Sequence, residues 1–455
     1  MALMRSINPF DGTELKVYET WDDKTLDKAL TLSAEAVPGW ADTAVDRRCA
    51  LMKEAASVLR RKKEELARMI TLEMGKLICE SRAEIDKCAL ACDYYAEHGP
   101  AIVADEPVAT DAGKSLVVYE PLGTVLAIMP WNFPFWQVFR FAAPALVAGN
   151  TGLLKHASNV PQCGLAIEQV FRDAGFPDGV FQNLMIPASM VSRCVQDERV
   201  HAATLTGSES AGRKVAAAAG EALKKTVLEL GGSDPFIVLD DADIDEAARQ
   251  AVASRFLNSG QSCISAKRFI VLESVAHAFL ERFKAGTEAL KPGNPLDETT
   301  TLAPLARPNL RDELHNQVTE SLRKGAKAVT GCEPVPGPGA FYKPSILTQI
   351  PEGTPAWSEE FFGPVASVFT VKDEQSAIRI ANITRFGLGS SVWTSDTARG
   401  ERLARKLQAG ACFVNGIVKS DPRLPFGGIK ASGYGRELSY HGLREFVNIK
   451  TLWIR

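Results

Sequence analysis

The sequence predicts an α/β fold, with parallel sheets that carry helices on both faces. From about residue 116 onward, short apolar runs bounded by Pro and Gly alternate with stretches of helical periodicity. The chain has 455 residues, enough for two to four domains of ordinary size. Hydrophobic residues make up 45% and charged residues 24%, which excludes a disordered or fibrous chain.

The first hundred residues are predicted to be helical. Between Val45 and Gly75 the apolar positions recur at the spacing of one long helix, and Gly75 supplies its C-terminal stop. A second apolar stripe follows at helical spacing and contains cysteines that we expect to be small core residues. It comprises Ile85, Cys88, Cys92 and Tyr95.

Strands and helices then alternate along the chain. The predicted strands are 116–119, 124–129, 152–155, 180–185, 202–206, 226–230, 236–239 and 268–272. The predicted helices are 162–174, a segment after Gly207, 244–257 and a segment from Val275. We expect one α/β unit to give way to another near Asp234-Pro235, with a ligand cleft between the two.

Charge and cysteine content exclude several classes of function. Lys and Arg number 52 against 55 Asp and Glu, so the net charge is −3 and no basic excess exists for a nucleic-acid partner. No apolar run reaches the length of a membrane span, and the first residues lack the apolar core of a signal peptide. Nine cysteines without a CxxC pair, and six histidines without zinc-ligand spacing, predict a reduced, cytoplasmic chain with no metal site.

One glycine pattern is placed to bind an anion. The dinucleotide fingerprint G-x-G-x-x-G is missing, and the nearest pattern runs from Gly207 to Gly212. It follows a predicted strand and opens a helix, where backbone N–H groups can hold a phosphate. A plain glycine turn before a helix is the alternative.

Three polar residues stand out from apolar or loop surroundings. Cys263 lies in the polar loop 258–265, where a thiol can ionise and attack a substrate. Glu229 ends an apolar strand, so it is either a paired structural carboxylate or a general base with a raised pKa. Asn132 lies between a strand and a helix, where it either donates to an oxyanion or caps the helix.

Together these segments resemble the aldehyde dehydrogenase superfamily over nearly the whole chain, and within it the short bacterial succinate-semialdehyde dehydrogenases. The matching motifs are Pro130-Trp-Asn-Phe-Pro134, Leu154-Lys155, Thr206-Gly-Ser208, Leu228-Glu-Leu-Gly-Gly232, Gly260-Gln-Ser-Cys263, Glu359-Glu-Phe-Phe-Gly-Pro364 and Pro425-Phe-Gly-Gly-Ile-Lys-Ala-Ser-Gly433.

The resemblance implies an aldehyde dehydrogenase-like fold of three parts. A Rossmann-like cofactor domain would span 1–105 and 122–233, and an α/β catalytic domain with the nucleophilic cysteine would span 234–425. A small β arm from 106–121 and 436–455 would pair subunits into a homodimer or a dimer of dimers.

The resemblance also implies NAD(P)-dependent oxidation of a small-molecule aldehyde to an acid. Cys263 would attack the aldehyde to give a thiohemiacetal and, after hydride transfer, a thioester. Asn132 and the N–H of Cys263 would hold the oxyanion, and Glu229 would activate the hydrolytic water. Succinate semialdehyde is the expected substrate, with glutarate semialdehyde or another small aliphatic aldehyde as the alternative.

For the cofactor, the resemblance assigns Glu360 to the nicotinamide ribose and Ser208 to the pyrophosphate. Further cofactor-lining positions are Trp131, Lys155, Gly207, Leu230 and Phe362. Ser158 stands where strongly NAD-preferring members often have glutamate, and His156 where proline is usual. Because serine does not repel a 2′-phosphate, we expect NADP to be favoured over NAD.

At the substrate end, Arg140 matches an arginine that grips the far carboxylate of the semialdehyde, and Ser420 would share that work. A surface salt bridge is the alternative for Arg140. A second family arginine is Leu257 here, and a second cysteine of some members is Ser265, so their disulfide switch should be absent.

Three rival functions remain open at this point. A coenzyme-A-acylating dehydrogenase would keep the cysteine but would not need Glu229 as a water-activating base. A cysteine hydrolase would need a histidine partner, and no histidine has a recognisable motif. A catalytically silent binding protein would not need Cys263, Glu229 and Asn132 together.

Overall fold

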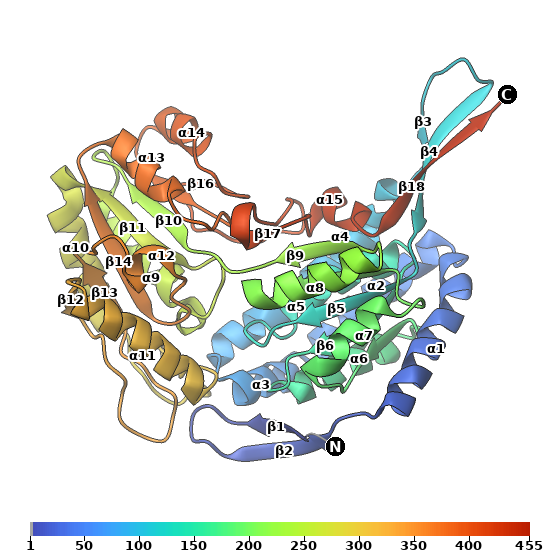
Figure 1. The fold of residues 1–455 in the computed structure, drawn as a ribbon, viewed down its shortest axis with the longest axis horizontal. Coiled ribbons are helices and arrows are strands. Elements are labelled where there is room, and N and C mark those ends of the chain that lie inside the picture. The colour runs from blue at the N-terminus through green and yellow to red at the C-terminus, as the bar shows by residue number, and fades with distance from the viewer. Residues whose placement is uncertain (1–2) are drawn as a thin grey trace.

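The computed structural model describes residues 3–455, which form two large sheets, an N-terminal hairpin and a projecting arm (Figure 1). The hairpin pairs β1 (Leu3–Ile7) with β2 (Glu14–Glu19) in antiparallel fashion. The prediction that the first hundred residues are helical is therefore wrong for the first twenty. This hairpin rests on the larger body, because its Ser6 and the Gln162 side chain are hydrogen bonded.

The first large sheet has six strands in the order β17-β9-β8-β5-β6-β7. All its neighbours are parallel except β17, which runs antiparallel to β9. The strands are β5 (Thr124–Met129), β6 (Thr151–His156), β7 (Phe181–Asn183), β8 (Ala202–Thr206), β9 (Lys225–Glu229) and β17 (Gly433–Tyr434).

Helices cover both faces of this sheet, which is why its strands are continuously apolar. Val125 and Ala127 of β5 pack into one core, and Leu126 between them packs into the other. The first core involves α2 (Val45–Arg61), α3 (Lys63–Met74), α4 (Ile78–Ile102), α5 (Trp136–Val147) and α6 (Pro161–Asp173). The second involves α1 (Asp23–Ala41), α7 (Val191–Gln196) and α8 (Glu209–Glu221).

The long helix predicted from Val45 is two helices, because the chain leaves helical geometry at Lys62. No proline or glycine occurs at this break, and the apolar residues keep their helical spacing across it. The sequence pattern therefore could not reveal the break. Gly75 does end α3, with a φ of 84° that a glycine adopts without strain. The apolar stripe of Cys88 and Cys92 lies in the core on α4, as predicted.

The second large sheet has seven strands in the order β12-β13-β14-β11-β10-β15-β16, parallel except for the edge strand β12. The strands are β10 (Asp234–Val238), β11 (Ala266–Leu272), β12 (Lys327–Thr330), β13 (Ser345–Thr348), β14 (Val365–Val371), β15 (Ser391–Trp393) and β16 (Phe413–Val414). Its helices are α9 (Ile244–Phe256), α10 (Glu273–Glu288), α11 (Pro308–Arg323), α12 (Pro355–Ser358), α13 (Glu374–Asn382) and α14 (Thr397–Ala404). The chain enters this sheet at Asp234, directly after the first sheet's β9.

The projecting arm is a three-stranded antiparallel sheet (Figure 1). It contains β3 (Glu106–Pro107), β4 (Lys114–Pro121) and β18 (Val447–Ile454), and the short α15 (Ser439–Arg444) leads into β18. β18 exposes Ile449, Trp453 and Ile454 to solvent in the isolated chain. Within residues 3–455, no helix combines the length and the apolar character needed to cross a membrane.

Candidate active site

A cavity of about 400 Å³ lies where the two large sheets meet. Its walls include the segments that follow β5, β8 and β9, which is the edge where parallel sheets place their ligands. The loop before β11, the segment before β14 and the first residues of α5 and α11 supply the rest. The lining residues are Pro130, Trp131, Asn132, Gln137, Thr206, Gly207, Ser208, Glu229, Leu230, Gly231, Cys263, Arg307, Leu310, Glu360 and Phe362.

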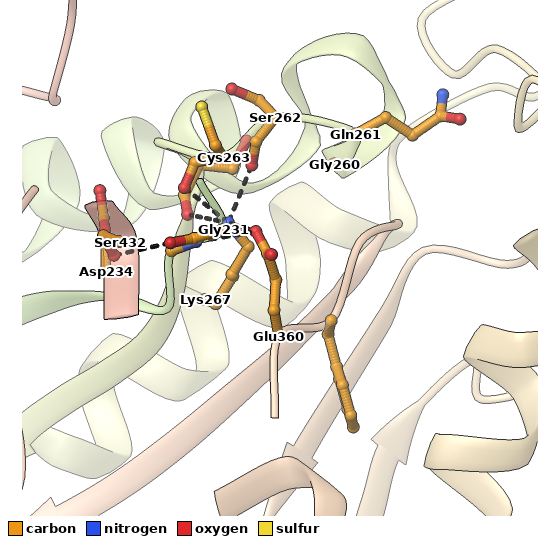
Figure 2. Close-up of polar contacts among 12 residues, drawn as sticks. Gly231, Asp234, Gly260, Gln261, Ser262, Cys263, Lys267, Glu360 and Ser432 are labelled. Atoms are coloured by element: carbon orange, nitrogen blue, oxygen red, sulfur yellow. Dashed lines mark hydrogen bonds and ion pairs between the residues drawn. The ribbon is translucent and has the colours of Figure 1, made fainter. Parts of the chain in front are cut away.

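The loop that contains Cys263 has a strained backbone, and the Lys267 ammonium fixes it through hydrogen bonds. Asn258 and Ser259 adopt left-handed φ angles of 52° and 53°, which cost energy in non-glycine residues. The Lys267 ammonium donates to the carbonyl oxygens of Ser262 (2.8 Å) and Cys263 (2.9 Å) (Figure 2). The strained loop therefore presents the thiol at a fixed position in the cavity.

The Cys263 thiol is protonated at rest. Burial raises its pKa to about 12, although the positive charges of Arg140 and Lys267 oppose that shift. The role of this thiol as the ionised nucleophile stays a prediction.

Asn132 joins the cavity wall to the cysteine loop. Its side-chain nitrogen donates to the backbone oxygen of Gln261 at 3.1 Å, and the Asn132 backbone oxygen accepts from the Asn258 side chain at 2.8 Å. An amide carries two hydrogens, so one remains for an oxyanion near Cys263. The alternative that Asn132 caps a helix is wrong, because the Glu84 carboxylate binds the first N–H groups of α5 instead.

Glu229 is fully buried at the end of β9, and neither carboxylate oxygen meets the geometry of a hydrogen bond within residues 3–455, although the Gly428 N–H lies near enough to lower its pKa. Burial raises its pKa well above the usual value, and the nearby Glu437 carboxylate adds to this rise while the Arg140 guanidinium opposes it. A buried carboxyl with a raised pKa can serve as a general base, and the choice between this role and a paired structural carboxylate stays a prediction.

Glu360 is fixed at the edge of the cavity. Its Oε1 accepts from the Gly232 N–H at 3.2 Å and lies 3.1 Å from the Lys267 ammonium. Figure 2 shows Glu360 beside Gly231 and Lys267. A Cβ atom at Gly231 would collide with Glu360 Oε2, and one at Gly232 would lie 2.6 Å from the Cys263 carbonyl oxygen, so both positions require glycine.

Ser208 connects this cavity to a second one of about 570 Å³ along α7 and α8. Ser208 is the N-cap of α8, and its hydroxyl accepts from the Ala211 N–H. Ser208 lines both cavities, and the N-terminus of a helix favours an anion. Binding of the cofactor pyrophosphate at the Gly207 turn stays a prediction.

The other predicted cofactor residues take defined positions. The Trp131 and Phe362 rings meet edge to face with centroids 5.8 Å apart, and both line the first cavity with Leu230. Lys155 is buried at the end of β6 and donates to the His156 carbonyl oxygen. Ser158 is exposed just beyond that strand end.

His156 fixes the Asn132 segment from the side of β6. Its Nε2 lies 2.9 Å from the Pro134 carbonyl oxygen, and its Nδ1 lies 2.9 Å from the Ala157 backbone nitrogen and 3.2 Å from the Met129 carbonyl oxygen. Burial lowers its pKa to about 4, which keeps the ring neutral. This contact gives a structural reason for histidine at a position where the resemblance led us to expect proline.

Arg140 is buried in an ion pair with Glu437, and its guanidinium stacks over Phe426. Its charge acts on both Cys263 and Glu229, although it is not among the residues that line the cavity. The alternative of a surface salt bridge is wrong, because the pair is buried. A direct contact between Arg140 and a substrate carboxylate stays a prediction.

Ser420 is buried against α4 and α5. Its hydroxyl accepts from Trp136 Nε1 at 3.1 Å and from the Lys87 ammonium at 2.8 Å. Sequence reasoning missed Lys87 and Lys267, because a lone lysine on a predicted helix or strand carries no functional signal. The position of Lys87 one residue before the buried Cys88 was the available hint that it faces inward.

Comparisons with known proteins agree with this geometry. The model of the aldehyde dehydrogenase family matches residues 2–452. A probable succinate-semialdehyde dehydrogenase [NADP(+)] of Synechocystis is 50% identical, with 99% of each chain covered. The succinate semialdehyde dehydrogenase [NAD(P)+] Sad of Escherichia coli is 48% identical, with 98% of this chain and 97% of the relative covered. The crystal structure of succinic semialdehyde dehydrogenase from Streptococcus pyogenes in complex with NADP+ superposes with a TM-score of 0.97 at 38% identity, with 99% of each chain covered.

Proposed function

The chain belongs to the aldehyde dehydrogenase family, and we propose that it oxidises succinate semialdehyde to succinate with NADP, or with NAD as a second choice. One observation carries the chemistry: a single cavity holds the Cys263 thiol, the Asn132 amide and the unsatisfied Glu229 carboxylate. The names of relatives that are about half identical support the substrate and the cofactor.

In this proposal the Cys263 thiol gives up its proton to solvent as its sulfur bonds to the aldehyde carbon. The remaining N–H of the Asn132 amide and the backbone N–H of Cys263 stabilise the negative oxygen of the thiohemiacetal. A bound nicotinamide would supply the hydride acceptor for this carbon, and loss of the hydride would leave a thioester on Cys263. Glu229 then takes a proton from water, the hydroxide attacks the thioester, and the carbon–sulfur bond breaks to release the acid.

The dinucleotide would lie across both cavities. Glu360 would hold the nicotinamide ribose, the α8 N-terminus at Ser208 the pyrophosphate, and the walls of Trp131, Leu230 and Phe362 the nicotinamide ring. The preference for NADP rests on Ser158, which is exposed at the end of β6 and adds no negative charge against a 2′-phosphate. The buried Lys155 ammonium adds positive charge in the same region.

The proposal includes the arrangement of the whole enzyme. The six-stranded sheet would be the core of the cofactor domain, and the seven-stranded sheet the core of the catalytic domain. The exposed apolar residues of β18 in the arm support pairing with a second copy, so we propose a homodimer or a dimer of dimers. A reducing, cytoplasmic location would keep the catalytic thiol active.

A panel of aldehydes with NAD and NADP tests the proposal. We expect the highest kcat/KM with succinate semialdehyde, lower values with glutarate semialdehyde and butanal, and NADP used at least as well as NAD. A preference for uncharged aldehydes would contradict the substrate assignment. Release of acyl-coenzyme A instead of free acid would favour the acylating alternative, and the absence of any reduced cofactor would favour a hydrolase.

A further inference from the structure

Lys267 of β11 is a buried cation beside the loop that contains Cys263 (Figure 2). Its ammonium donates to the carbonyl oxygens of Ser262 at 2.8 Å, Cys263 at 2.9 Å and Ser265 at 3.3 Å. The same nitrogen lies 3.1 Å from Glu360 Oε1 at the edge of the cavity. An ammonium has three hydrogens, so these contacts use its full donor capacity. Lys267 therefore directs its charge at the main chain on both sides of Cys263.

One of these bonds acts on the peptide group that carries the Cys263 N–H. The Ser262 carbonyl and the Cys263 N–H belong to the same planar unit and point in opposite directions. A cation bonded to the oxygen therefore fixes the direction of the N–H. It also draws electron density away from the nitrogen, which makes the N–H a stronger donor. Within residues 3–455 this N–H has no acceptor, so it remains available to a ligand.

The preceding peptide group is fixed by other donors. The Gln261 carbonyl oxygen accepts from the side-chain nitrogens of Asn132 and Asn258, each at 3.1 Å. Asn132 and Lys267 thus bind neighbouring carbonyl oxygens of one loop. Neither peptide group can turn without breaking one of these contacts, so the Asn132 amide and the Cys263 N–H keep a fixed relative position.

The positive charge of Lys267 also acts on the ionisable groups around it. Burial raises the pKa of the Cys263 thiol, the charges of Arg140 and Lys267 oppose that rise, and the Glu360 carboxylate adds to it. Burial raises the pKa of Asp234 to about 7, and Lys267 opposes this rise as well. Lys267 therefore favours negative charge in the space beside Cys263, where a negative oxygen would form.

Arg268, the next residue of β11, is a structural counterpart of Lys267. It is equally buried, and it points to the opposite face of the strand. Its guanidinium donates to the backbone oxygens of Ile380 and Ala381 near the end of α13. Loss of either cation would leave buried carbonyl oxygens without their donors, but only Lys267 contacts the loop that contains Cys263.

We propose that Lys267 is a positioning residue of the oxyanion site. It orients and polarises the peptide group between Ser262 and Cys263, so that the Cys263 N–H binds the negative oxygen more strongly. This inference rests on the proposed function, because it takes Cys263 as the nucleophile and its N–H as an oxyanion donor. It gives the buried charge a role in the chemical step as well as in the fold.

Two reactions of the Cys263 thiol, neither of which needs a cofactor, separate this role from a structural one. With 4-nitrophenyl acetate the sulfur bonds to the carbonyl carbon, a negative tetrahedral oxygen forms, and 4-nitrophenolate leaves to give a thioester. With iodoacetamide the sulfur bonds to a saturated carbon as iodide leaves, and no oxyanion forms. In both reactions the thiol proton goes to solvent and the thiolate attacks, so the ratio of the acylation rate to the alkylation rate reports oxyanion stabilisation. Mass spectrometry of the peptide that contains Cys263 measures both rates.

Lys267→Met should lower both rates, and acylation more. We expect alkylation to fall by about tenfold, through a higher thiol pKa, and acylation by about 100-fold, so that the ratio falls by about tenfold. Arg268→Met is the matched loss of a buried cation on the same strand and should leave the ratio unchanged, whatever its effect on stability. Far-UV circular dichroism checks that each variant is folded.

A second variant tests the same charge without altering the buried lysine. Glu360→Gln removes the carboxylate that offsets Lys267 at the edge of the cavity, and it should raise the acylation rate by about threefold or more. An acylation rate that does not rise in this variant would overturn the proposal.

The remaining outcomes separate this proposal from the proposed function. An unchanged ratio in Lys267→Met, or an equal fall of the ratio in Arg268→Met, would overturn the role of Lys267 while leaving the proposed function in place. A wild type whose Cys263 takes up neither reagent would overturn the nucleophile assignment, and the proposed function with it.

Discussion

Two buried carboxylates on either side of the Asn132 segment have opposite environments. Behind the segment, Glu84 forms a buried ion pair with Lys76 and accepts two backbone N–H groups, and the Lys76 ammonium also lies over the Phe133 ring. In the cavity, Glu229 is equally buried, yet neither of its oxygens is hydrogen bonded among the described residues. Only the Asn132 segment separates the two carboxylates.

This difference distinguishes charged groups that fix the geometry of the site from charged groups that take part in the reaction. A satisfied carboxylate such as Glu84 fixes the start of α5 and therefore the position of Asn132. An unsatisfied carboxyl such as Glu229 is costly to bury, and this cost makes sense where a proton must be exchanged. Substitutions on the cavity side should therefore affect chemistry, and substitutions behind it should affect stability.

The largest effect is expected at the nucleophile. Cys263→Ala should lower turnover by at least about a thousandfold, because no other group in the cavity can form the thioester. Cofactor affinity should stay nearly unchanged, and titration of the protein fluorescence with NADP measures it. Retention of more than about a tenth of wild-type turnover would show that Cys263 is not the nucleophile.

The next effect concerns the unsatisfied carboxyl. Glu229→Gln should reduce steady-state turnover by about 10²- to 10⁴-fold, the usual range for loss of a general base. If its main role is hydrolysis, stopped-flow absorbance should show a burst of reduced cofactor before a slow phase. Loss of the burst as well would assign Glu229 to activation of the thiol, whose high pKa calls for a base. Normal steady-state turnover would exclude both roles.

Substitution of Glu84, the carboxylate whose hydrogen bonds are complete, should lower the stability of the protein. Glu84→Gln leaves the buried Lys76 ammonium without a counter-charge and should lower the free energy of unfolding by about 3–5 kcal/mol. Denaturant or thermal unfolding measures it. The matched control is Asp86→Asn on the same helix, which removes an exposed pair with Lys63 and should cost less than about 1 kcal/mol. Equal effects from the two variants would remove the distinction between the regions.

The smallest effect is expected at the cofactor ribose. Ser158→Glu should shift the ratio of kcat/KM for NADP over NAD toward NAD by about tenfold or more, because the added carboxylate repels the 2′-phosphate. The ratio is measured with both cofactors at one saturating aldehyde concentration. An unchanged ratio, or a wild type that already prefers NAD by about tenfold, would contradict this view of Ser158.

The sequence could predict the buried parallel strands and much of the cavity. β5 and β8 have the bounds expected from their apolar runs, because both faces of these strands are covered. The break at Lys62 could not be predicted, since no glycine or proline marks it. The β1–β2 hairpin could not be predicted either, because its segment has no clear strand pattern. Cys263, Glu229 and Asn132 carried motif signals. Lys267 did not, because its role depends on which carbonyl oxygens the folded chain places beside it.

The central claim is that Cys263 and Glu229 divide the reaction into formation and hydrolysis of a thioester. Mass spectrometry of Glu229→Gln after mixing with NADP and succinate semialdehyde tests it most directly. The account predicts one succinyl group per chain, attached to Cys263 and absent when the cofactor is omitted. An unmodified Cys263 in a variant that has released reduced cofactor, or a succinyl group on another cysteine, would contradict it.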